Sequence, residues 1–80
     1  MNSYSKKYKV WRNGRKEEMT YGDVCHELGF ICECAFVKIT TAGTITFTCG
    51  KPDEICALFR AVKRCGFAPA KGLERAIKYA

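Results

Sequence analysis

The dipeptide Asn13-Gly14 constrains the fold of this chain more than any other feature. Both central residues of a type I′ turn need a positive φ, so Asn-Gly between two alternating segments predicts a β-hairpin with a two-residue loop. That loop sets the register, with Arg12 opposite Arg15, Trp11 opposite Lys16, Val10 opposite Glu17, Lys9 opposite Glu18 and Tyr8 opposite Met19. The buried face is then formed by Tyr8, Val10, Met19 and Tyr21, and Trp11 lies on the opposite face with Lys7, Lys9 and Lys16.

A second hairpin is predicted over residues 31–40 and 44–49, where the later segment alternates strictly between threonine and larger residues. Its apolar residues Ile45 and Phe47 share a face with Val37 and Ile39 only if the loop spans residues 41–43, with Gly43 left-handed. A two-residue loop would swap the faces, so burial favours the three-residue loop. This register leaves on the opposite face Cys32, Cys34, Phe36 and Lys38.

Three helices are expected between and after the hairpins. Thr20 and Asp23 have the spacing of an N-cap with an acidic third residue, and Gly29 is suited to end the helix that follows. A longer helix is predicted over residues 52–65, and a shorter one over residues 71–79. The predicted fold is α+β in the order ββα-ββα-α, an antiparallel sheet packed by helices. The 80 residues form one domain, with residues 1–6 as a flexible tail.

The residue types favour a binding protein over an enzyme. His26 is the only histidine, and the only serines, Ser3 and Ser5, lie in the expected tail, so no Ser-His-Asp set can form. Cys25, His26, Cys32 and Cys34 lack the paired spacing of zinc ligands, and we predict no metal site. No glycine-rich phosphate loop is present, so no cofactor is predicted.

The chain is expected to be cytoplasmic and not to associate with membranes. It has no apolar run long enough to span a bilayer and no secretory signal at its N-terminus. The six cysteines are then expected to stay reduced. A secreted form with three disulfides is the alternative for the same cysteine count.

Positive charge gathers at the two ends of the sequence. Residues 1–16 sum to +6, residues 17–36 to −5, residues 37–54 to zero and residues 55–80 to +5, which makes the net charge +6. Cations beside an exposed aromatic ring suit a phosphate backbone and an unstacked base. The pair Arg12 and Arg15 should repel unless an anion lies between them. The predicted nucleic-acid-binding residues are Lys7, Lys9, Trp11, Arg12, Arg15, Lys16, Arg60, Lys63, Arg64, Lys71, Arg75 and Lys78.

The sequence leaves two alternatives open. Another element could cover the face of Trp11, and the indole would then belong to the core. The chain could also be a small inhibitor or adaptor that binds an acidic protein surface, as anti-defence proteins of phages and mobile elements do; only the size of the chain suggests this. Such a protein would either place its positive face in an acidic groove or use as an anchor a face formed by Cys34, Phe36 and Lys38.

Overall fold

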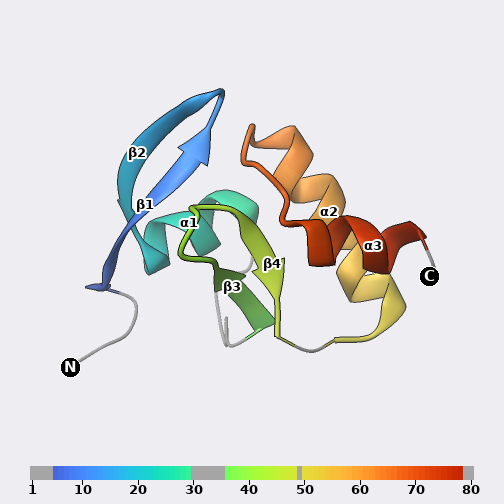
Figure 1. Ribbon diagram of the computed structural model, residues 1–80. Coiled ribbons are helices and arrows are strands. Elements are labelled where there is room, and N and C mark those ends of the chain that lie inside the picture. Colours follow the sequence, from blue (N-terminus) through green and yellow to red (C-terminus); the bar gives the residue numbers. More distant parts are fainter. Residues whose placement is uncertain (1–4, 30–35, 49, 79–80) are drawn as a thin grey trace.

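The computed structural model describes residues 5–29, 36–48 and 50–78. It has an α+β fold in the predicted order ββα-ββα-α (Figure 1). The elements are β1 (Lys7–Arg12), β2 (Arg15–Thr20), α1 (Tyr21–Leu28), β3 (Val37–Ile39), β4 (Ile45–Phe47), α2 (Pro52–Arg64) and α3 (Lys71–Lys78).

The first hairpin has the register that Asn13-Gly14 predicts. β1 and β2 pair residue by residue from Lys7 opposite Thr20 to Arg12 opposite Arg15. Asn13 and Gly14 have φ values of 53° and 79°, as a type I′ turn requires. Val10 is fully buried and Met19 half-buried, so the predicted core face is confirmed.

Helix α1 begins at a capping box. The Thr20 hydroxyl accepts a hydrogen bond from the Asp23 amide at 3.0 Å, and the Asp23 carboxylate accepts one from the Thr20 amide at 3.4 Å. These bonds satisfy amide groups that a helix start leaves without partners. The Lys6 carbonyl accepts a hydrogen bond from the Tyr21 amide at 2.9 Å, so this residue of the predicted tail is bonded to the start of α1. Residues 1–4 of that prediction lie outside the described residues.

The second hairpin has the register that burial favours. β3 and β4 pair with Val37 opposite Phe47 and Ile39 opposite Ile45, across a three-residue loop in which Gly43 has a φ of 89°. Both strands are shorter than predicted. Residues 31–35 and 49, which the prediction included in the strands, lie outside the described residues. Next to the loop, the hydroxyls of Thr40 and Thr44 form a hydrogen bond of 2.7 Å.

Helices α2 and α3 begin and end close to the predicted residues. α2 starts with Pro52, and the Lys51 amide donates to the Glu54 carboxylate at 2.9 Å. It ends one residue before the predicted boundary. The last predicted residue of α3, Tyr79, lies outside the described residues.

The two hairpins form separate two-stranded sheets, and the connector between α2 and α3 (residues 65–70) links them. At one end of the connector, the Gly66 carbonyl accepts a bond from the Asn13 amide at 2.7 Å. Farther along, the Ala68 carbonyl accepts from the Ile45 amide, and the Ala70 amide donates to the Ile45 carbonyl, both at 2.9 Å. The second hairpin therefore lies between the first hairpin and α3 (Figure 1).

One apolar core holds these parts together. α1, β3, β4, α2 and the connector all contribute to it, and β1 and α3 each add one fully buried side chain. The buried residues are Val10, Val24, Cys25, Leu28, Val37, Ile39, Ile45, Leu58, Ala61, Val62, Phe67 and Leu73. The partly buried Tyr21 donates its hydroxyl to the Val37 carbonyl, which ties α1 to the second hairpin.

Candidate nucleic-acid interface

The side of the first hairpin that faces away from the core carries Trp11. Because side chains alternate along a strand, the burial of Val10 turns Lys9 and Trp11 to the opposite side. We call this side the hairpin outer face, formed by Lys7, Lys9, Trp11, Lys16, Glu18 and Thr20. Trp11 is 38% exposed, and among the described residues it is the one large hydrophobic side chain that is exposed. The Lys16 ammonium lies 5.4 Å from the centre of its ring.

One edge of the indole rests on the turn of the second hairpin. The Trp11 amide donates to the Gly43 carbonyl at 2.9 Å. A Cβ atom on Gly43 would lie 2.6 Å from the Lys9 carbonyl oxygen and 3.3 Å from Cδ1 of Trp11. Glycine thus permits the turn to approach the edge of β1, and this contact fixes the indole without covering it. Gly43 was predicted as a loop residue, but its contact with β1 has no signal in the sequence.

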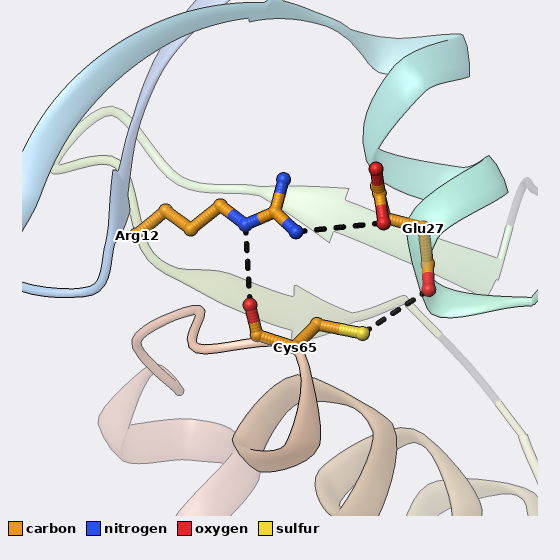
Figure 2. A network of polar contacts seen from close by, with 3 residues as sticks. All are labelled: Arg12, Glu27 and Cys65. Atoms are coloured by element: carbon orange, nitrogen blue, oxygen red, sulfur yellow. Dashed lines mark hydrogen bonds and ion pairs between the residues drawn. The ribbon is translucent and has the colours of Figure 1, made fainter.

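Arg12 uses its guanidinium inside the fold. Its Nε donates to the Cys65 carbonyl at 3.2 Å, and Nη2 lies 3.4 Å from Oε2 of Glu27 (Figure 2). The guanidinium carbon also lies 5.0 Å from the ring centre of Phe67. Glu27 thus places a carboxylate beside Arg12, one member of the arginine pair. The predicted phosphate contact of Arg12 stays a prediction, and these internal contacts compete with it.

Cys65 completes this network from the end of α2. Its thiol donates to the main-chain carbonyl of Glu27 at 3.1 Å, so Cys65 and Glu27 are joined both directly and through Arg12 (Figure 2). The three residues come from β1, α1 and the residue that follows α2. Nothing in the sequence pattern pairs them.

The basic end of α2 lies beside the turn of the first hairpin (Figure 1). The bond between the Asn13 amide and the Gly66 carbonyl holds the two together. Arg15 next to the turn is exposed, as are Lys63 and Arg64 in the last turn of the helix. We call these three residues the tip cluster. Arg60 is exposed one turn earlier on the same helix. Two of the predicted basic segments therefore meet.

The basic stripe of α3 lies elsewhere. Lys71, Arg75 and Lys78 are exposed and line a shallow hollow together with Glu74. Figure 1 shows α3 and the first hairpin on opposite sides of β4. The twelve predicted residues therefore do not form one continuous surface. The tip cluster lies at the turn end of the first hairpin, where Arg15 pairs with Arg12 on the face opposite the hairpin outer face, and the α3 stripe stands apart.

The alternative protein-binding face is partly used in the packing of the fold. Phe36 is partly buried, packs against the core, and has its ring centre 6.4 Å from that of Phe47. A Cβ atom on Gly50 would lie 2.3 Å from the Phe36 ring, so that segment also packs on it. Lys38 is exposed, and Cys34 lies outside the described residues. Phe36 is thus engaged within the fold.

Other kinds of site have little support within the part of the chain that the structure describes. No three histidine, cysteine, aspartate or glutamate side chains there gather as metal ligands would. Cys32 and Cys34, two of the zinc candidates, lie outside it. Cys56 and Cys65 carry free thiols. No helix among the described residues is long and apolar enough to cross a membrane.

Comparison with protein-family models, with curated proteins and with solved structures found no match. A fold on its own does not specify a function. A function for this chain must therefore be inferred from the chemistry and placement of its side chains.

Proposed function

We propose that this protein is a non-enzymatic nucleic-acid-binding protein that holds the phosphate backbone on the hairpin outer face and the tip cluster. The observation that carries the proposal is the exposed indole of Trp11 between Lys9 and Lys16. A tryptophan is usually well buried in a small domain, and an exposed one among cations suits a ligand that is both anionic and aromatic.

The proposed binding to nucleic acid is mainly electrostatic. Lysine and arginine side chains that neutralise phosphates release condensed counterions, and this supplies most of the affinity in sequence-independent binding. The net charge of +6 attracts polyanions over a distance of about one Debye length, ~8–10 Å at physiological salt. Glu18, opposite Lys9, opposes this attraction locally.

Recognition of backbone and shape fits this surface better than reading of base edges. Contacts to phosphates position a protein without reading sequence. Adenine is read bidentately by asparagine or glutamine, of which the chain has only Asn2 and Asn13, and the arginines and lysines that could read guanine bind phosphates equally well. Asn13 is used in the turn. We expect the protein to act by occupying nucleic acid, in an accessory or regulatory role.

The test is a binding titration with short DNA and RNA oligonucleotides across a salt series. The double variant Lys9→Ala/Lys16→Ala should weaken binding and reduce the slope of log K against log salt by about 1.4–1.8, because each phosphate contact contributes about 0.7–0.9. The control Lys38→Ala/Lys51→Ala removes the same charge from exposed sites on β3 and before α2, and should leave more of the slope intact.

Absence of binding to either nucleic acid at low salt would refute the proposal. The positive surface would then point to an acidic protein partner. Binding with no salt dependence would also count against it, because phosphate contacts cannot be made without counterion release.

A further inference from the structure

The hairpin outer face carries a positive ridge that is one strand wide. β1 contributes Lys7, Lys9 and Trp11, spaced about 6.7 Å apart because two residues of a strand rise by about that distance. About 4.8 Å to one side, β2 places the exposed Glu18 opposite Lys9. Positive charge therefore follows β1 and extends to β2 at Lys16, beside the indole.

Neither side of this ridge offers a place for a second phosphate backbone. The two backbones of a duplex flank grooves about 6–12 Å wide. On the side of β2, a second backbone would meet Glu18, which is exposed on this face opposite Lys9. On the other side lies the turn of residues 41–43, which carries no cation. A single backbone along β1 avoids both.

Lys16 lies over the ring of Trp11, so a base that stacks on that side of the indole takes the place of its ammonium. A cation over an aromatic ring at an exposed site is worth about 2- to 5-fold in an equilibrium constant. Stacking of a base on an aromatic side chain is worth about 5- to 150-fold. Stacking therefore outweighs the cation–π contact, and a base can displace the ammonium.

We infer that the ligand is single-stranded nucleic acid and that one unpaired base stacks on the indole of Trp11. The backbone of that strand follows β1, with phosphates at Lys9 and Lys16. The bases of an intact duplex are stacked on one another and offer no free face to the indole. This inference rests on the proposed function and narrows it to one class of nucleic acid.

Trp11 is the only tryptophan, so its fluorescence reports the contact directly. In one experiment, the emission of Trp11 in the intact protein is followed as oligo(dT), or a duplex of equal phosphate number, is added. In a second experiment, each of these two ligands competes against labelled oligo(dT), which gives their relative affinities. Oligo(dT) should quench the emission and bind more tightly than the duplex. Trp11→Ala should weaken binding of oligo(dT) about 5- to 150-fold and leave duplex binding unchanged. Trp11→Phe keeps a ring and should retain most of the affinity.

The outcomes separate this inference from the proposed function. If duplex and oligo(dT) bind equally, with steep salt dependence and no loss in Trp11→Ala, the single-strand inference is wrong and the proposed function stands. If neither nucleic acid binds, both fail. Circular dichroism checks that Trp11→Ala folds. If this variant does not fold, the wild-type protein still provides the test. Binding of oligo(dT) without quenching of the Trp11 emission would overturn the inference.

Discussion

The side chain of Arg12 joins two segments that lie far from it in the sequence. It contacts Glu27 on α1 and, 53 residues away, the Cys65 carbonyl. Hydrogen bonds that involve a charged group contribute about 1.5–3 kcal/mol, more than an ion pair at an exposed site, which contributes about 0–1 kcal/mol. The bond to the Cys65 carbonyl therefore contributes more to the stability of the fold than the ion pair with Glu27. Arg12 stabilises the domain whether or not it also binds phosphate.

Replacement of Arg12 should lower the stability of the fold. Arg12→Ala is expected to reduce the free energy of unfolding by about 1–3 kcal/mol, as measured by urea denaturation. Arg15→Ala, its exposed cross-strand neighbour, is the control and should change stability by less than about 0.5 kcal/mol. Equal effects of the two substitutions would show that the bond to Cys65 contributes nothing.

Two left-handed glycines differ in what surrounds them. Gly14 has a φ of 79° with nothing within 4 Å of a Cβ atom, and Gly43 has a φ of 89° with the Lys9 carbonyl 2.6 Å away. Alanine at either position adopts an unfavourable backbone conformation, which costs about 1–2 kcal/mol. At Gly43 it also collides with the main chain of β1.

The variant Gly43→Ala should accordingly cost more stability than Gly14→Ala. We expect the first to exceed the second by about 1 kcal/mol or more in the free energy of unfolding, because the turn must move away from β1. It should also shift the emission of Trp11, whose indole rests on that turn. An equal loss in both variants, without a spectral shift, would mean that the turn is not docked there.

At the scale of elements, α2 and α3 present similar basic faces in different places. The end of α2 adjoins the first hairpin through the bond between Asn13 and Gly66, whereas α3 packs against α2 and lies near β4. Periodicity identifies both stripes but contains no information on which surface each will join.

The two helices should therefore differ in their effect on binding. Lys63→Ala/Arg64→Ala is expected to reduce the salt slope for a single-stranded ligand by about 1.4, at about 0.7 for each lost contact. The matched pair Lys71→Ala/Arg75→Ala removes the same charge and should change the slope by less. Both slopes are measured by titration across a salt series. A larger change in slope for Lys71→Ala/Arg75→Ala than for Lys63→Ala/Arg64→Ala would place the ligand on α3.

At the scale of the whole molecule, the connector after α2 contacts both hairpins and joins them to the helices. Phe67, buried at 3% exposure, lies under Arg12, and residues 68–70 pair with Ile45. A domain of this size has a stability of about 4–12 kcal/mol. The loss of one connector side chain can remove a large part of that.

Phe67→Ala should destabilise both hairpins together. The expected loss is about 3–5 kcal/mol, as for other buried phenylalanines. Trp11 fluorescence, which reports the first hairpin, and far-ultraviolet circular dichroism, which reports the helices, should move to the same lower midpoint. A first hairpin that unfolds separately from the helices would contradict the coupling through the connector.

The sequence determined the elements and their registers. Asn13-Gly14, the capping box at Thr20 and the alternation of residues 44–49 act over a few residues, so local turn chemistry and periodicity were sufficient to predict them. The assignment of Trp11 to the face of Lys7, Lys9 and Lys16 followed from the same rules.

Only the tertiary structure decided whether that face stays open, which partners Arg12 takes, whether Phe36 packs inward, and which basic stripes meet. These outcomes depend on contacts between segments far apart in the chain, such as Trp11 with Gly43 and Asn13 with Gly66. Such contacts arise from the packing of whole elements around one core, which no local pattern encodes. Register follows from short-range chemistry, whereas the surface follows from how the elements pack.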